Sequence, residues 1–225
     1  MPARVGVVLF PGSNCERDAV EAIRELGGDA DILWHGDSAL GGVDAVILPG
    51  GFAHGDYLRP GAIARFSPVM DAVRAFAADG GPVVGICNGF QVLTEAGLLP
   101  GALQKNAGLK FLCTTSTIRV EATSTPLTSQ ASVGDELRIP INHFEGSFTC
   151  DADTLAMLRA EDRVPLRYVD NPNGSIDDIA GVCSEGRNVV GLMPHPERAC
   201  HPLVGSTDGV VLLRSLLASA GAAVG

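Results

Sequence analysis

The sequence has few basic and few aromatic side chains. Lysine and arginine together number 16, against 26 aspartate and glutamate residues, and the formal net charge at pH 7 is −10. This acidic excess argues against nonspecific binding to nucleic acid or to an anionic membrane surface. Aromatic residues make up 5% of the chain, whereas hydrophobic residues make up 46%. We therefore expect a sizeable core built mainly from Val, Leu, Ile and Ala.

Three further patterns are missing. No apolar run reaches membrane-spanning length, and residues 1–10 lack the apolar stretch and cleavage site of a signal peptide. The six cysteines form no C-x-x-C pair, so neither a zinc site nor a redox motif is indicated. No G-x-x-x-x-G-K-S/T run is present, so no Walker-type ATP site is expected. We therefore expect a chain without a metal of its own, and a free catalytic thiol would fit the reducing cytoplasm.

The first half of the chain alternates strand-like and helix-like segments. The expected strands are 4–10, 30–34, 44–48 and 82–86, and the expected helices are 13–26, 62–78 and 87–96. Ser13 and Glu16 are spaced as a capping box for the first helix. Strands that alternate with helices pair in parallel, so we expect a doubly wound α/β sheet. Its ligands should bind outside the carboxyl ends of the strands.

The second half has a different pattern. Its strand candidates are 110–121, 135–141, 180–185 and 188–193, and a last helix is expected from about Ser206 to Ala220. The last two strands are close enough to form a hairpin. Because no repeat or obvious linker interrupts the chain, we expect one domain over residues 1–225. It should combine a parallel core with antiparallel additions.

Cys87 is the most informative residue of the chain. It directly follows the strand 82–86 and precedes a helical pattern, with Gly85 and Gly89 two positions to either side. This order is the nucleophile-elbow pattern with cysteine in place of serine. A helix N-terminus favours the thiolate, which is the reactive form. An isolated cysteine is more often a buried structural thiol, but this context favours a nucleophile.

A cysteine nucleophile needs a base, and the base needs a group that orients it. His195 lies just past an apolar strand, and Glu197 is two residues further on, with a proline between them. In an extended chain these two side chains point to the same side, so the carboxylate can orient the imidazole. The alternative is a rigid surface loop. Together with the elbow, the pattern favours a triad of Cys87, His195 and Glu197.

The oxyanion of an acyl-transfer reaction needs hydrogen-bond donors. The backbone N–H of Asn88, directly after the nucleophile, is one candidate. The other is the N–H of Gly51 or Phe52, in the loop after the third strand. The Gly50–Gly51 pair permits close approach of the backbone to a ligand, although an ordinary turn is the commoner role of such a pair.

The other histidines and cysteines have weaker patterns. His143 follows a strand candidate, and it either lines the same pocket or is a hydrogen-bonded surface residue. Cys15 lies in the first turn of the first expected helix, near the same edge, and we expect it to be a packed thiol. The remaining ones are expected to be structural, exposed or inert, and they are His35, His54, His201, Cys113, Cys150, Cys183 and Cys200.

These motifs resemble those of the class I glutamine amidotransferases with a Cys-His-Glu triad. Within this class the sequence is most similar to the glutaminase subunits of phosphoribosylformylglycinamidine synthases. The similar segments are FPGSNCERD (10–18), PGGFAHGDYLRPGA (49–62), GICNGFQVL (85–93), DNPNGSI (170–176), GLMPHPER (191–198) and GSTDG (205–209). The resemblance implies a flavodoxin-like three-layer sandwich with a mostly parallel central sheet and antiparallel additions.

The resemblance also implies roles for single residues. It makes Cys87, His195 and Glu197 the triad, with the oxyanion held by Asn88 and by Gly51 or Phe52. It places three further residues in the glutamine pocket, namely Gln91, His143 and Glu145. One departure is Phe144, where the family has a glycine, and its bulk bears on the roles of His143 and Glu145.

The implied activity is hydrolysis of glutamine to glutamate and ammonia through a cysteine thioester. The ammonia would pass to a large synthetase subunit that converts formylglycinamide ribonucleotide to formylglycinamidine ribonucleotide in purine biosynthesis. ATP and magnesium are expected on that partner, and a small bridging subunit is the second expected partner. Two alternatives remain open, a peptidase or γ-glutamyl hydrolase on the same scaffold and a non-catalytic regulatory subunit that binds glutamine.

Overall fold

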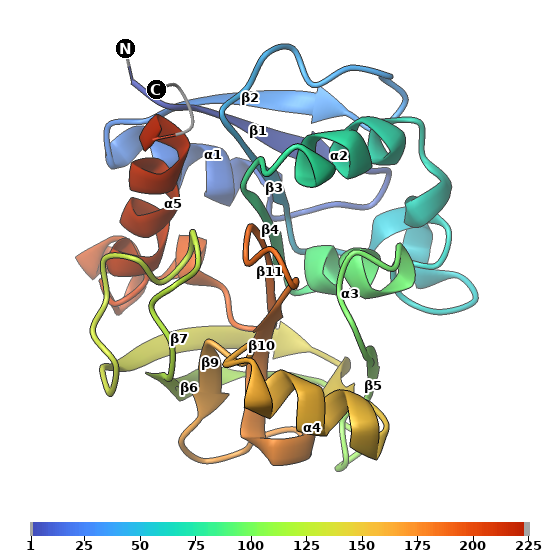
Figure 1. The fold of residues 1–225 in the computed structure, drawn as a ribbon, viewed down its shortest axis with the longest axis vertical. Helices are drawn as coiled ribbons and strands as arrows, with labels where there is room; N and C mark the ends of the chain where they lie inside the picture. The colour runs from blue at the N-terminus through green and yellow to red at the C-terminus, as the bar shows by residue number, and fades with distance from the viewer. Residues whose placement is uncertain (1, 223–225) are drawn as a thin grey trace.

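The computed structural model describes residues 2–222. Its main feature is a nine-stranded sheet in the order β2-β1-β3-β4-β11-β10-β9-β6-β7 (Figure 1). The first five strands of this order are parallel, and they are β2 (Asp29–Trp34), β1 (Arg4–Leu9), β3 (Ala45–Leu48), β4 (Val83–Ile86) and β11 (Val189–Leu192). The antiparallel strands are β10 (Ile179–Cys183), β9 (Leu166–Tyr168), β6 (Leu112–Val120) and β7 (Glu136–His143).

Helices cover both faces of the parallel part of the sheet. Figure 1 shows α1 (Glu16–Glu25) and α5 (Val210–Ala222) on one side and α2 (Val69–Ala78) and α3 (Asn88–Glu95) on the other. Strands β3, β4 and β11 are therefore buried along their whole length, which explains their continuous apolar sequences. The predicted sandwich with a parallel core and antiparallel additions is confirmed.

The local predictions differ from the structure in two helices. Helix α1 begins after Cys15, which makes no side-chain cap, and the Ser13 hydroxyl instead accepts a hydrogen bond from the Phe10 N–H. The capping box was therefore wrong, because residues 10–13 form a turn. The helix expected over 62–78 is split into a 3₁₀ segment and α2, with Ser67 extended between them. Pro68 explains this break, since proline disfavours the α conformation of the preceding residue.

The sequence analysis did not predict three short strands and one short α-helix. A second, two-stranded sheet pairs β5 (Ala102–Lys105) with β8 (Glu145–Thr149). The third missed strand is β9, and the missed helix is α4 (Ala152–Ala160). Asp151 caps the N-terminus of α4, because its side chain accepts a hydrogen bond from the Thr154 N–H. The expected hairpin between β10 and β11 is present. Within residues 2–222, no helix has both the length and the apolar character needed to cross a membrane.

Candidate active site

Cys87 occupies a strained turn between β4 and α3. Its φ of 51° lies in the left-handed region, and its N–H donates to the Leu192 carbonyl at the end of β11. A Cβ on Gly89 would collide with the Leu48 carbonyl, and one on Gly85 would lie 2.5 Å from Leu93. Both flanking positions therefore require glycine, as the elbow pattern predicts.

The sheet places His195 at the same edge as Cys87. Strands β4 and β11 are parallel neighbours with Ile86 opposite Leu192, so they end level with one another. The chain after β11 is fixed by a hydrogen bond from the His195 N–H to the Pro140 carbonyl at 2.8 Å. A thiol and an imidazole from two distant parts of the sequence are thereby brought together.

Glu197 holds the imidazole from the other side. Its Oε1 accepts a hydrogen bond from Nδ1 of His195 at 2.6 Å, and both side chains are 1% exposed. Burial by itself would lower the pKa of His195, but Glu197 and the neighbouring Cys87 and Cys15 thiols raise it well above its usual value. Nε2 has no aligned hydrogen-bond partner within the described part of the chain. The imidazole is thus oriented and is stabilised in its charged form.

The two predicted oxyanion donors from the loop after β3 are not equivalent. The Phe52 N–H donates to the Gly12 carbonyl at 2.9 Å, so the prediction of Phe52 as a donor is contradicted. Gly51 has a φ of 142°, and a Cβ there would lie 2.7 Å from the Asn14 nitrogen. The N–H of Asn88 is in the first turn of α3, where backbone donors have no partner inside the helix. Gly51 and Asn88 remain the candidate pair.

The side chain of Asn88 has a role that the sequence analysis missed. Its Oδ1 accepts a hydrogen bond from the Ala53 N–H at 3.0 Å, and its Nδ2 donates to Gln91 at 2.8 Å and to Asp56 at 3.2 Å. Asn88 is 1% exposed. It therefore ties the glycine-rich loop to the start of α3, directly beside Cys87.

A cavity of about 250 Å³ opens in front of Cys87. Its wall is formed by residues of three segments, 51–60, 87–91 and 142–145. Gln91 lines it and donates through Nε2 to the Glu145 carbonyl. Burial raises the pKa of Asp56 to about 6, against the effect of the Asn88 hydrogen bond, and Glu145 raises it further. Two carboxyl groups therefore lie close together in this cavity.

His143 is in the wall of the cavity and not on the surface. It is 3% exposed, and burial together with the nearby His195 lowers its pKa to about 4, so the ring is neutral at pH 7. Its Nδ1 donates to Oδ1 of Asn106 at 3.1 Å. The alternative of a surface histidine is therefore wrong. The backbone φ of the adjacent Phe144 is not positive, so this position does not require a glycine.

Asn106 organises the wall and was not predicted. It is 1% exposed, and its side-chain amide donates to the carbonyls of His143 and Lys110, at 3.0 and 2.9 Å. Its Oδ1 also accepts from the Gly146 N–H at 3.2 Å. A single asparagine therefore satisfies the backbone groups on both sides of Glu145.

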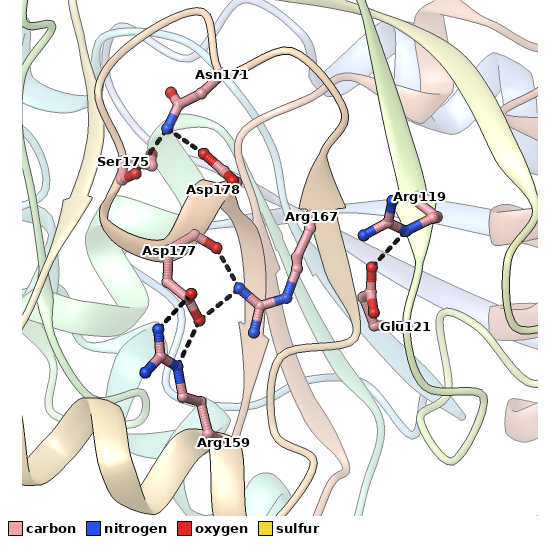
Figure 2. Close-up of polar contacts among 8 residues, drawn as sticks. All are labelled: Arg119, Glu121, Arg159, Arg167, Asn171, Ser175, Asp177 and Asp178. Atoms are coloured by element: carbon pink, nitrogen blue, oxygen red, sulfur yellow. Dashed lines mark hydrogen bonds and ion pairs between the residues drawn. The ribbon is translucent and has the colours of Figure 1, made fainter.

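The loop 170–178 supports the same wall from behind. Asn173 donates to the Gly146 carbonyl at 2.8 Å, and the Ser175 hydroxyl accepts from the Phe148 N–H at 3.0 Å. Figure 2 shows the outer end of this loop, where Asp177 lies between Arg159 and Arg167. Asp177 forms ion pairs with Arg159 and with Arg167. The Arg159 hydrogen bond has the larger effect, and the two arginines lower the pKa of Asp177 to about 2 although burial opposes the shift.

Cys15 is a packed thiol, as expected, but its position beside His195 was not predicted. It is 2% exposed, and burial raises its pKa although the nearby His195 acts in the opposite direction. Of the other cysteines, Cys183 is buried, Cys113 is exposed, and the remaining two, Cys150 and Cys200, are half-buried. None of the six is paired in a disulfide.

The comparisons with known proteins agree with this geometry. Residues 2–208 match the model of the CobB/CobQ-like glutamine amidotransferase domain. The chain is 62% identical over 217 residues to phosphoribosylformylglycinamidine synthase subunit PurQ of Rubrobacter xylanophilus, which covers 96% of this chain and 99% of the relative. It is 52% identical over 224 residues to the same subunit of Koribacter versatilis, with 95% and 97% covered.

Solved structures agree with these sequence matches. A chain of the PurLQS structure from Thermotoga maritima superposes with a TM-score of 0.90 at 43% identity, and the match covers 97% of this chain and 99% of that chain. A putative GMP synthase subunit from Thermoplasma acidophilum has a TM-score of 0.68 at 18% identity, with 99% and 96% covered, and shares the fold. The chain belongs to the CobB/CobQ-like glutamine amidotransferase family, and within it to the PurQ subunits of phosphoribosylformylglycinamidine synthase.

Proposed function

We propose that this chain is the glutaminase subunit of a phosphoribosylformylglycinamidine synthase. It hydrolyses glutamine to glutamate and ammonia, and the ammonia is used by a synthetase partner to convert formylglycinamide ribonucleotide to formylglycinamidine ribonucleotide. The observation that carries this proposal is the buried His195–Glu197 pair beside the elbow thiol of Cys87. The high identity to PurQ subunits over nearly the whole chain supports the choice of partner reaction.

The first chemical step uses the proton balance of this site. Because Glu197 and Cys87 raise the pKa of His195, the proton of the thiol is stabilised on the imidazole, and the sulfur becomes a thiolate. The thiolate attacks the side-chain carbonyl carbon of glutamine and forms a tetrahedral oxyanion. The N–H groups of Gly51 and Asn88 donate to this oxyanion.

The tetrahedral adduct then collapses in the forward direction. His195 gives its proton to the amide nitrogen, the carbon–nitrogen bond breaks, and ammonia leaves a γ-glutamyl thioester on Cys87. The neutral imidazole next takes a proton from water, whose oxygen attacks the thioester carbonyl. The sulfur leaves as a thiolate again and glutamate is released, so that the site returns to its starting state.

The cavity in front of Cys87 matches an α-amino acid with an amide side chain. Asp56 and Glu145 lie in its wall and attract the α-ammonium group, whereas Arg59 on the same wall is already paired with Glu95. Gln91 and His143 shape the wall between these charges and the nucleophile. The two carboxyl groups favour a ligand with an ammonium group over an uncharged amide.

The partners follow from the relatives. The solved relative carries the name PurLQS, and we infer that this chain assembles with a large synthetase subunit and a small bridging subunit of the same kind. ATP and magnesium belong to the synthetase partner in this proposal. The whole chain, residues 1–225, acts as one amidotransferase domain, and its six unpaired cysteines suit the reducing cytoplasm.

Ammonia release from glutamine tests the proposal directly. The chain is assayed alone and with its two partner subunits, and glutaminase activity should rise when the partners are present. Cys87→Ala should abolish the activity in both preparations while the complex still assembles. Parent-level hydrolysis by Cys87→Ala would exclude the mechanism. Glutamine binding without ammonia release by the parent complex would favour a regulatory subunit.

A further inference from the structure

A second group of reactive side chains lies behind the catalytic imidazole. Cys15, His195 and Glu197 each offer one sulfur, nitrogen or oxygen atom, and these three atoms all lie within 4.8 Å of one another. All three residues are buried. Gly50 makes this approach possible, because a Cβ there would lie 2.6 Å from the His195 ring and 3.1 Å from the Cys15 sulfur. Cys15 comes from the start of α1, 180 positions away from His195.

The group contains polar atoms without protein partners. Oε2 of Glu197 and Nε2 of His195 are buried and have no hydrogen-bond partner among the residues that the structure describes. The side chains of Glu197 and His195 are both 1% exposed. A buried carboxylate oxygen without a donor is costly, so the site is suited to a ligand that supplies positive charge.

The chemistry of the three ligands selects the cation. A thiolate, an imidazole nitrogen and a carboxylate oxygen are the ligand types that proteins use for Zn²⁺. Magnesium and calcium prefer sites made only of oxygen. We propose that Cys15, His195 and Glu197 form a zinc site that inhibits the enzyme. Zinc binding would release to solvent the thiol proton of Cys15 and the proton of the imidazole nitrogen that it occupies, so the imidazole no longer serves Cys87.

A separate cavity borders this site at Glu197. A pocket of about 480 Å³ is lined by Glu197, and by Asp18, Glu21 and Glu25 of α1. It shares no lining residue with the glutamine cavity. Arg198 pairs with Asp18 at 2.9 Å, and the other two carboxylates add negative charge to the approach. In this proposal zinc enters from the side of this cavity and not through the glutamine cavity, so glutamine should not compete with it.

Cobalt(II) provides a direct binding test that does not depend on activity. The chelator-treated full-length chain is titrated with Co²⁺, and thiolate coordination is followed by the near-ultraviolet charge-transfer band. The band should appear in the parent and in Cys87→Ser, and it should be lost in Cys15→Ser and Cys15→Ala. Cys113→Ser and Cys150→Ser are matched controls that should keep it. Circular dichroism checks that every variant is folded.

The competing assignments give different patterns in the same experiment. A band that survives in both Cys15 variants and disappears in Cys87→Ser would place the metal on the nucleophile and overturn the proposal. A band lost only in Cys113→Ser or Cys150→Ser would place the metal on a cysteine outside this group and would overturn it as well. Zinc should displace cobalt and remove the band in the parent, and calorimetric titration should show that Cys15→Ser weakens zinc binding on the order of tenfold or more.

The inhibition itself rests on the proposed glutaminase function and is measured in the reconstituted complex. Zinc should lower kcat for ammonia release in the parent and leave KM for glutamine unchanged. The ratio of activity with and without zinc, taken within each variant, should be restored towards one by Cys15→Ser. A rise in KM with constant kcat would contradict the separate access route. An inactive chelator-treated parent would count against the glutaminase function, whereas the cobalt band would still decide the binding site.

Discussion

Nδ1 of His195 lies 2.6 Å from Oε1 of Glu197 in a setting where both side chains are almost completely removed from solvent. A carboxylate in this position does two things at once. It fixes the tautomer, so that Nε2 is the nitrogen available to the nucleophile, and it raises the pKa of the imidazole against the effect of burial. Orientation and charge therefore depend on the same contact.

Removing the charge of Glu197 should separate its effect on the pKa of His195 from any effect on glutamine binding. Glu197→Gln keeps the shape but removes the negative charge, so the pKa of His195 should fall and the thiolate of Cys87 should lose its counterion. We expect kcat for ammonia release to fall on the order of a hundredfold or more. Because the imidazolium of the parent persists to higher pH, the alkaline limb of the activity profile should move to lower pH in the variant.

Glu121→Gln is a matched control for this change, since Glu121 forms an ion pair with Arg119 (Figure 2) and does not line the glutamine cavity. It should leave the profile of kcat against pH unchanged. A Glu197→Gln variant with the parent's profile would show that the carboxylate does not tune the imidazole.

The glutamine cavity should depend on the asparagines behind its wall. Asn173→Ala removes the hydrogen bond to the Gly146 carbonyl and leaves a buried acceptor without that donor. We expect a loss of stability of about 1–3 kcal/mol and a rise in KM for glutamine that exceeds the fall in kcat. Steady-state ammonia release and urea unfolding measure the two effects.

Asn171→Ala tests whether this effect belongs to the wall or to the loop as a whole. Asn171 donates to the Ser175 carbonyl and to Asp178 (Figure 2), and its Oδ1 accepts from the N–H groups of Asn173 and Gly174, so all these hydrogen bonds lie inside the loop. It should change KM much less than Asn173→Ala. Equal rises in KM in the two variants would mean that general loosening of the loop is responsible.

Sequence reasoning succeeded where chemistry and fold are encoded locally. The apolar runs of β1, β3 and β4 and the glycines around Cys87 are short patterns, and each has one structural explanation. The level ends of β4 and β11 then bring Cys87 and His195 to one edge. The position of Cys87 and His195 at strand ends follows from the sequence and the rules of parallel sheets, whereas the parallel pairing of β11 with β4 was not predicted.

The remaining features depend on packing between distant segments. Asn106 contacts His143 across 37 positions and Cys15 lies beside His195 across 180 positions, so no local spacing reports either contact. The Phe52 N–H failed as an oxyanion donor because residues 12–14 fold back onto the Gly50–Gly51 loop and take that hydrogen bond. This competition between partners is visible only when both segments are in place.

The ion pairs of Asp177 with Arg159 and Arg167 should make the stability of the fold depend on pH in the acid range. Its pKa of about 2 lies below the usual carboxyl value of 3.8, so its ionised form stabilises the fold. This contribution is present above pH 4 and is lost as the pH falls through about 2. After allowance for solvent screening, Asp177→Asn should lower the free energy of unfolding by about 1–2 kcal/mol at pH 7, and the difference should shrink towards pH 2. A constant difference in urea unfolding across this range would contradict the ion-pair explanation.

The elbow glycines give the sharpest test of the local fold. In Gly89→Ala the added methyl group collides with the Leu48 carbonyl, which is part of a fully buried strand and has no room to move. We expect a loss of about 1–3 kcal/mol in urea unfolding, together with a displaced Cys87 and reduced ammonia release. Gly108→Ala is the matched control, because a Cβ at Gly108 meets no atom within 4 Å and its backbone does not have a positive φ. Equal stability of the two variants would show that the turn at Cys87 relaxes more easily than its contacts indicate.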